Sequence, residues 1–185
     1  MRWLLLLPLV VLALFFVDLD VASFFCHHKI ALFKLITHLG NAAPYLLAGL
    51  GAYLYYRSRK PLWAKKGLYL FLSVLLSGIL TTLLKILIGR PRPKIFFEHH
   101  LWQPQWLEFK ASFWSIPSGH TTTAFAAGVA LGYIFPRYRL LFWIMAALVG
   151  LSRIALCKHY PSDVVVAAFI GSAVAWYLHK RMGVE

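Results

Sequence analysis

Long apolar runs separated by short polar connections extend along the whole 185-residue chain. Six such segments can be drawn, approximately Leu4–Val17, Ala42–Tyr56, Gly67–Ile88, Thr121–Phe135, Leu140–Cys157 and Val164–Leu178. Several are shorter than the ~20 residues that cross a ~30 Å hydrocarbon core, so they must include flanking residues. The pattern predicts an all-α, polytopic membrane protein with six transmembrane helices in a single membrane-embedded domain over residues 1–185.

Two segments between these runs are typical of the membrane interface. Over residues 24–38, a helix would place His27, Lys34 and His38 on one face and apolar side chains on the other, which predicts an interfacial helix. The connection 94–116 is rich in aromatic residues, which favour the headgroup level. Anchoring is the simpler role for this connection, and a lid is the alternative.

Charge changes this picture in two ways. The net charge is +13, from 19 Lys and Arg against 6 Asp and Glu, in a chain that is 61% hydrophobic. In so apolar a chain, this charge favours the lipid bilayer over nucleic acid as the partner. Ten basic residues lie at residue 2, in the connections 57–66 and 137–139, and at 180–181. The positive-inside rule then places both termini in the cytoplasm and the opposite helix ends outside.

The few acidic residues and the two cysteines limit the chemistry. Catalytic magnesium is held by several converging carboxylates, so we expect no metal and no other cofactor. Asp18 and Asp20 are expected to mark the polar end of the first span. Cys26 and Cys157 are too few for a disulfide framework. They could form one bridge at the outer face, but buried free thiols are the expected state.

Three short patterns lie at the outer ends of the predicted spans. The first is Lys85-x6-Arg92-Pro93, where Gly89 and the prolines end the helix. The second is Pro117-Ser118-Gly119-His120, directly before an apolar run. A helix start offers unpaired N–H groups to an anion, and Ser118 could bind that anion, cap the helix, or do both.

The third pattern is Ser152-Arg153-x5-His159-x3-Asp163. The spacing of four could bring Asp163 within reach of one imidazole nitrogen of His159. Such a contact would fix the tautomer and leave the other nitrogen as a nucleophile. Taken together, the patterns supply three cations, two histidines and one carboxylate, which suits transfer of a phosphoryl group through a histidine.

The chain resembles the type-2 phosphatidic-acid phosphatase family, whose three motifs are matched at every fixed position between residues 85 and 163. The resemblance implies that His159 attacks phosphorus while Asp163 orients it. His120 would protonate the leaving oxygen and later activate water. The phosphoryl oxygens would be held by Lys85, Arg92, Ser118, Gly119 and Arg153.

The resemblance also implies a metal-independent phosphatase acting on a membrane lipid phosphate at the outer leaflet of a bacterial inner membrane, with the active site facing the periplasm. Lipid A 1-phosphate is the expected substrate, and undecaprenyl pyrophosphate or phosphatidylglycerophosphate are the alternatives. An anion transporter or channel using the same cations is a further alternative. It would place its charges near mid-membrane, whereas these lie at helix ends. The sequence indicates no oligomeric state.

Overall fold

The computed structural model describes residues 7–28 and 32–184, and every regular element within these ranges is helical. The long helices are α1 (Leu7–His27), α3 (Ala42–Tyr56), α4 (Pro61–Ile88), α6 (Gly119–Ile134), α7 (Arg139–Ala155) and α8 (Pro161–Met182). The short ones are α2 (Phe33–Ile36), η2 (Thr37–Gly40), α5 (Pro93–His99), η3 (Ala111–Phe113) and η4 (Pro136–Tyr138). The all-α prediction is confirmed, and each predicted apolar segment overlaps one long helix.

Three helical segments of the described residues are long and apolar enough to cross a membrane. They are Pro61–His99, which joins α4 to α5, Pro136–Ala155 and Pro161–Met182. Large apolar side chains such as Leu83, Leu140 and Leu151 are more than half exposed on the outer faces of these helices. An apolar exterior of this kind is what hydrocarbon chains would cover. The count of six crossings stays a prediction.

Helix α6 lies at the centre of the bundle and packs against α4, α7 and α8. Small residues allow this close packing. A Cβ on Gly128 would lie 3.0 Å from the carbonyl oxygen of Phe142 on α7, and a Cβ on Gly171 would lie 2.4 Å from that of Thr122. Larger residues at these two positions would push α7 and α8 away from α6.

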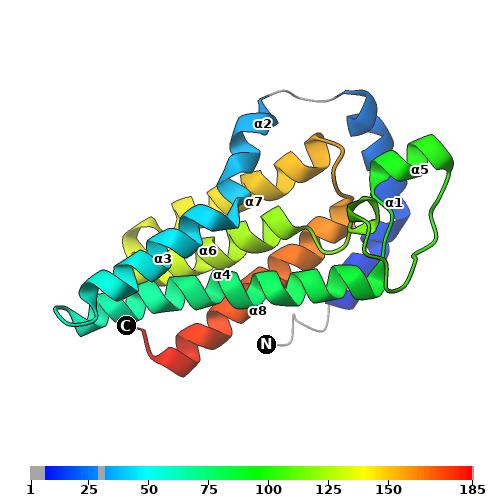
Figure 1. Cartoon of the computed structure of the whole chain (residues 1–185). Coiled ribbons are helices and arrows are strands. Elements are labelled where there is room, and N and C mark those ends of the chain that lie inside the picture. The colour runs from blue at the N-terminus through cyan, green and yellow to red at the C-terminus, as the bar shows by residue number, and fades with distance from the viewer. Residues whose placement is uncertain (1–6, 29–31, 185) are drawn as a thin grey trace.

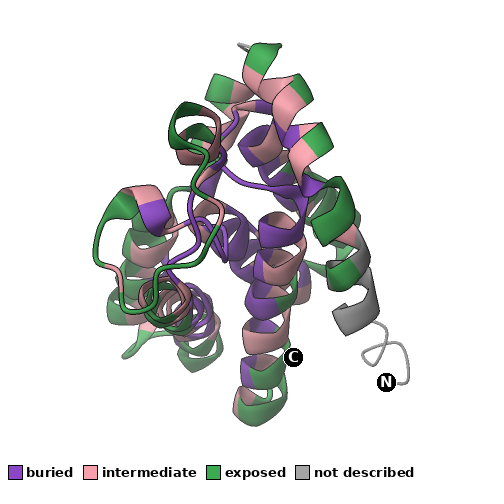
Figure 2. Cartoon of the chain, turned by 90° about the vertical axis from the view of Figure 1, so that its right-hand side faces the viewer, coloured by how far each residue is buried: buried purple, intermediate pink, exposed green. Residues whose placement is uncertain are grey.

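The helix ends that carry the three motifs meet at one end of the molecule. In Figure 1 the end of α4 and the starts of α6 and α8 lie toward the right, near α1 and α5, whereas the α3–α4 turn lies at the far left. Figure 2 looks onto this end and shows buried residues between the helices there. The bundle therefore brings residues from distant parts of the sequence together at one end.

The connection after α4 folds back onto the helix end. Gly89 ends α4 with a left-handed conformation (φ 57°), and its carbonyl accepts a hydrogen bond from the Gln105 N–H at 2.9 Å. A Cβ on Gly89 would collide with the Gln105 carbonyl, so the turn requires glycine. The Ser115 N–H then donates to the Arg90 carbonyl at 3.0 Å. These bonds place residues 105–115 beside the first motif.

The single interfacial helix predicted over residues 24–38 is wrong. Helix α1 continues through His27, and the later part of the range forms α2 and the start of η2; residues 29–31 lie outside the described part. The sequence of this range is amphipathic, but tertiary contacts divide it between separate helices. α2 packs on α7, and η2 packs on α6 and α7.

Cys26 and Cys157 form a disulfide, so the expectation of free thiols is wrong. Their Cα atoms are 4.9 Å apart although 131 residues separate them in sequence. The bond joins the end of α1 to the connection between α7 and α8. Sequence alone could not decide the pairing, because it depends on where α1 ends in space.

Breaking this bond is expected to destabilise the protein. Closing so long a loop stabilises a folded chain by about 2–4 kcal/mol, so dithiothreitol should lower the midpoint of thermal unfolding in detergent. The double variant Cys26→Ser/Cys157→Ser should unfold at the lower midpoint and no longer respond to dithiothreitol. Alkylation of both thiols in the unreduced protein would contradict the assignment.

Candidate active site

Lys85 reaches the start of α6 from the last turn of α4. Its amine lies 3.2 Å from the position that a Cβ would occupy on Gly119. Any larger residue at position 119 would therefore press on the amine. The ammonium group and the first N–H groups of α6 face the same space, which suits an anion.

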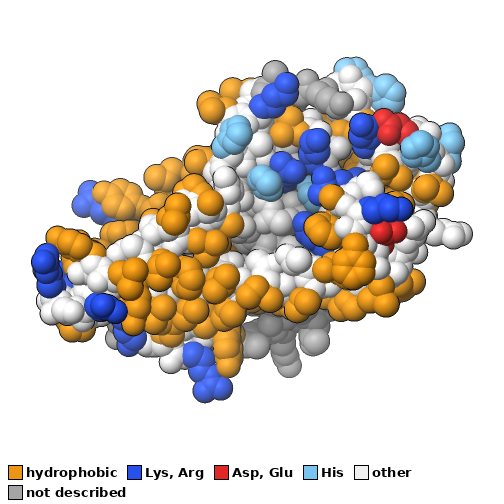
Figure 3. Space-filling view, in the orientation of Figure 1, with side chains coloured by type: hydrophobic (Ala, Val, Ile, Leu, Met, Phe, Trp, Pro, Cys, Tyr) orange, Lys and Arg blue, Asp and Glu red, His pale blue; other side chains and the backbone are white. Residues whose placement is uncertain are grey.

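Arg92 and Arg153 bring two guanidinium groups to the same end of the bundle. Arg153 Nη1 donates to the Thr37 hydroxyl of η2 at 2.7 Å, and the Arg92 backbone N–H donates to the Ser112 carbonyl at 2.9 Å. In the described part of the chain, the Nε atoms of both arginines are buried without a hydrogen-bond partner. Unpaired buried donors are costly, so these atoms indicate where an anionic ligand would bind. Figure 3 shows Lys, Arg and His side chains gathered around a recess at this end.

Ser118 occupies the N-cap position of α6 without acting as a side-chain cap. Its hydroxyl accepts a hydrogen bond from the Thr121 hydroxyl at 2.9 Å, and no backbone N–H donates to it. Its own N–H donates to the Asp163 carbonyl at 3.3 Å, which joins the second motif to the third. The capping alternative is therefore wrong for the side chain. The hydroxyl proton of Ser118 can serve an anion.

His159 lies in the connection between α7 and α8 and is almost completely buried. Its Nδ1 is 2.7 Å from the Ser115 carbonyl oxygen. Because a carbonyl only accepts, Nδ1 carries the proton and Nε2 keeps its lone pair. Burial lowers the pKa of His159 to about 4, which Asp163 opposes and the charges of Arg153 and Arg92 reinforce. The imidazole is thus neutral at neutral pH and keeps a lone pair on Nε2.

Asp163 lies beside His159, as its spacing predicts, but it is not the closest acceptor. The distance from its Oδ2 to His159 Nδ1 is 3.7 Å. This is too long for a hydrogen bond, so the two groups interact through electrostatic attraction only. The same oxygen accepts hydrogen bonds from the Ser115 hydroxyl at 2.5 Å and the Tyr160 N–H at 2.9 Å. Ser115 therefore fixes the tautomer directly, and Asp163 holds both Ser115 and the His159 loop.

His120 lies in the first turn of α6, against η2. A Cβ on Gly40 would lie only 2.7 Å from the His120 Cβ, so this contact requires glycine. The charges of Arg153 and Arg92 act on His120, and the same two guanidinium groups act on His159. Both imidazoles therefore border one cationic region, to which Lys85 also contributes.

Four residues near the site were missed in the sequence. Ser115 and Thr37 lie outside the motifs and carry no local signal. Asp18 is buried and pairs with Arg90, so its expected role as the polar end of the first span is wrong. One signal was available, because a carboxylate within an apolar run is costly unless a cation pairs with it. Arg90, two residues before Arg92 of the first motif, is the cation that pairs with Asp18.

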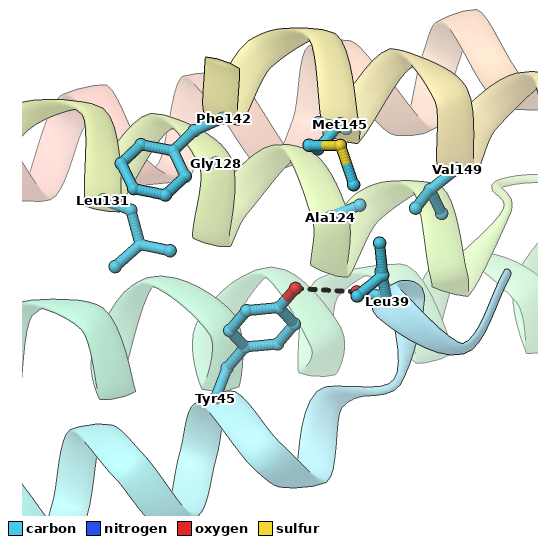
Figure 4. Close-up of a pocket in the computed structure, with 9 residues that line it drawn as sticks. Leu39, Tyr45, Ala124, Gly128, Leu131, Phe142, Met145 and Val149 are labelled. Carbon is cyan, nitrogen blue, oxygen red and sulfur yellow. Dashed lines mark hydrogen bonds between the residues drawn. The ribbon is translucent and has the colours of Figure 1, made fainter. Parts of the chain in front are cut away.

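Two cavities are lined by helices and connections that also carry site residues or pack against them. One, of about 430 Å³, lies beside Arg92 and is also lined by Lys94, Lys158 and the disulfide. The other, of about 200 Å³, is apolar and lies between η2, α3, α6 and α7 (Figure 4). Among residues 7–28 and 32–184, no group of three His, Cys, Asp or Glu is placed to hold a metal ion.

Residues 66–184 match the PAP2 superfamily, and the chain belongs to this superfamily. This confirms the resemblance that the three motifs indicated. Over 111 residues the chain is 40% identical to the lipid A 1-phosphatase of Rhizobium johnstonii. The match covers 60% of this chain and 44% of that protein. The chain therefore aligns with less than half of this relative's length.

Two solved structures share the fold. The crystal structure of LpxE from Aquifex aeolicus superposes with a TM-score of 0.66 at 25% identity, covering 89% of this chain and 95% of that one. The PAP2-type phosphatidylglycerolphosphate phosphatase of Bacillus subtilis superposes with a TM-score of 0.71 at 22% identity, covering 98% and 96%. Together with the long apolar helices, these matches define a membrane protein of the PAP2 fold.

Proposed function

We propose that this protein is a metal-independent lipid phosphatase that works through a phosphohistidine. The observation that carries the proposal is the environment of His159. Its Nδ1 is bound to the Ser115 carbonyl, and the charges of Arg92 and Arg153 act on its ring. A neutral imidazole beside two guanidinium groups suits nucleophilic attack on a phosphate.

The chemistry would proceed in two steps. First, His159 Nε2 forms a bond to phosphorus while the bond from phosphorus to the lipid oxygen breaks, and His120 gives that oxygen a proton. Then His120 takes a proton from water, the water oxygen bonds to phosphorus, and the bond to His159 breaks. Inorganic phosphate leaves and the free imidazole returns. Lys85, Arg92 and Arg153 would balance the charge on the phosphoryl oxygens, with donors from Ser118 and Gly119.

The proposed setting is the bacterial inner membrane, with six crossings, both termini in the cytoplasm and the site at the periplasmic surface. The distribution of basic residues supports this orientation. The disulfide between Cys26 and Cys157 gives independent support, because disulfides persist in oxidising compartments such as the periplasm. The bond lies at the same end of the molecule as the motifs.

Lipid A 1-phosphate is the proposed substrate. The cavity of about 430 Å³ beside Arg92 has room for a bulky polar headgroup next to the cleaved phosphate. The relative at 40% identity is named for this activity. Undecaprenyl pyrophosphate and phosphatidylglycerophosphate would use the same cations and stay as alternative substrates.

The apolar cavity of about 200 Å³ would receive one acyl chain of the substrate. The small residues Ala124 and Gly128 of α6 and Ala146 of α7 line it, together with Leu39 of η2 (Figure 4). Met145→Trp should fill it and lower kcat/KM for a long-chain lipid phosphate about 10-fold, as lost apolar pocket contacts do. Hydrolysis of water-soluble 4-nitrophenyl phosphate should be unchanged.

The matched control is Ile144→Trp, since Ile144 is the neighbouring residue on α7 and is exposed on the outer face. That variant should behave as the unmodified protein with both substrates. Equal losses for the lipid and for 4-nitrophenyl phosphate in Met145→Trp would count against an acyl-chain site.

The function itself can be tested with a panel of purified lipid phosphates in mixed micelles. We expect phosphate release that survives EDTA, is inhibited by vanadate, and is fastest with lipid A 1-phosphate. Liposomes with trapped phosphate serve to test the transporter alternative. Phosphate movement across the membrane without hydrolysis of any lipid would refute the phosphatase.

A further inference from the structure

Arg90 lies at the centre of a buried ionic network that joins α1 to the start of α8. Its Nη1 donates to Asp163 Oδ1 at 2.6 Å and to the Ser162 hydroxyl at 2.7 Å. Its Nη2 donates to Asp18 Oδ2 at 2.8 Å. The side chains of Arg90, Asp18 and Asp163 are all at most 4% exposed.

The guanidinium group of Arg90 binds other side chains of the protein, unlike those of the arginines at the phosphate site. Both of its terminal nitrogens donate to protein oxygens, whereas the Nε atoms of Arg92 and Arg153 have no partner among the described residues. Aromatic rings also enclose its guanidinium group, at 4.2, 4.5 and 5.1 Å for Tyr160, Phe15 and Trp102. Such enclosure stabilises the cation and fixes its plane. Arg90 is therefore built to hold side chains, not substrate.

Asp18 reaches the first turn of α8 from α1. Its Oδ1 accepts a hydrogen bond from the Ser162 N–H at 3.0 Å, and its Oδ2 accepts one from the Ser162 hydroxyl. A carboxylate at the first turn of a helix satisfies a donor that has no partner within the helix and complements the helix dipole. Asp18 thus caps α8 from a different helix, one residue before Asp163.

We propose that Asp18 and Arg90 are positioning residues for the catalytic loop. They hold Asp163, and through it Ser115 and His159, in the geometry needed for attack on phosphorus. Arg90 donates a hydrogen bond to Oδ1 of Asp163. Oδ2 therefore stays available to accept a hydrogen bond from the Ser115 hydroxyl and to face His159. Neither residue is a fixed position of the three motifs, and Asp18 lies outside residues 66–184 that match the superfamily. The inference rests on the proposed phosphatase function.

The charge balance explains why Asp18 matters for the reaction as well as for the fold. One guanidinium group lies between two carboxylates, so the cluster keeps one net negative charge beside His159. That charge stabilises the positive imidazole ring of a phosphohistidine. Without the charge of Asp18, Arg90 would neutralise Asp163 completely, and this stabilisation would be lost.

The test compares Asp18→Asn with Asp20→Asn in the full-length protein. Both changes remove one carboxylate from α1, but Asp20 is exposed. In Asp18→Asn we expect kcat for lipid A 1-phosphate in mixed micelles to fall about 10- to 100-fold, as when a hydrogen bond between charged groups is lost. The inhibition constant of inorganic phosphate should stay unchanged, because Lys85, Arg92 and Arg153 remain in place. Asp20→Asn should match the unmodified protein.

A second variant, Arg90→Lys, keeps a cation between the carboxylates but loses the planar group that bonds to both. It should show the same loss of kcat with an unchanged inhibition constant for phosphate. This variant tests the proposal if Asp18→Asn does not fold. Unchanged kcat in either folded variant would overturn the proposal. So would a parallel loss of phosphate binding and thermal stability, which indicates a structural role only. An unmodified protein without phosphatase activity would instead refute the proposed function.

Discussion

His159→Ala is expected to lower the turnover of lipid phosphate by about 10⁴-fold or more, as removal of a nucleophile does in other enzymes with covalent intermediates. Alanine leaves no atom that can bond to phosphorus. The side chain is 2% exposed, and the Ser115 carbonyl holds its Nδ1 in place. Phosphate release from a radiolabelled lipid phosphate, with rapid acid-free quenching, measures both turnover and the covalent intermediate.

The phosphoenzyme should be present in the unmodified protein, stable to base, labile to acid and absent from His159→Ala. His99→Ala is the matched control, because His99 is an exposed histidine at the end of α5. It should retain full turnover and the full amount of phosphoenzyme. A labelled protein in the His159→Ala variant would show that another residue is the nucleophile.

His120→Ala is expected to lower kcat for a lipid phosphate by about 10²- to 10⁴-fold, the range for loss of a general acid or base. Its position at the start of α6, beside the cations Arg153, Lys85 and Arg92, places the imidazole next to the proposed phosphate site. The variant should separate the two chemical steps. An activated leaving group needs no proton, whereas attack by water still requires a base.

With 4-nitrophenyl phosphate, the His120→Ala variant should therefore release one equivalent of nitrophenol in a burst and then turn over slowly. Its phosphoenzyme should accumulate above the level in the unmodified protein. Stopped-flow absorbance and trapping of the labelled protein measure the two quantities. A variant that shows neither burst nor accumulation, yet still binds inorganic phosphate, would assign the general acid and base to another group.

The local sequence determined the helices and the kinds of side chain at the helix ends that carry the three motifs. Apolar runs predicted Ala42–Tyr56 to the residue and placed the other helices approximately, because hydrophobic length and helix-ending glycine and proline are local properties. The three motifs could likewise be interpreted from local sequence. Each motif is short, and each adjoins the end of a helix, so its residues can be interpreted from the local sequence.

Only the tertiary structure decided which groups hold His159 in place. The Ser115 carbonyl acts on His159 across 44 residues, and Asp18 acts on Ser162 across 144. The disulfide between Cys26 and Cys157 likewise joins distant segments, and the interfacial pattern at 24–38 was divided by packing on α6 and α7. Such contacts depend on how whole helices pack, and no local pattern of residues encodes that arrangement.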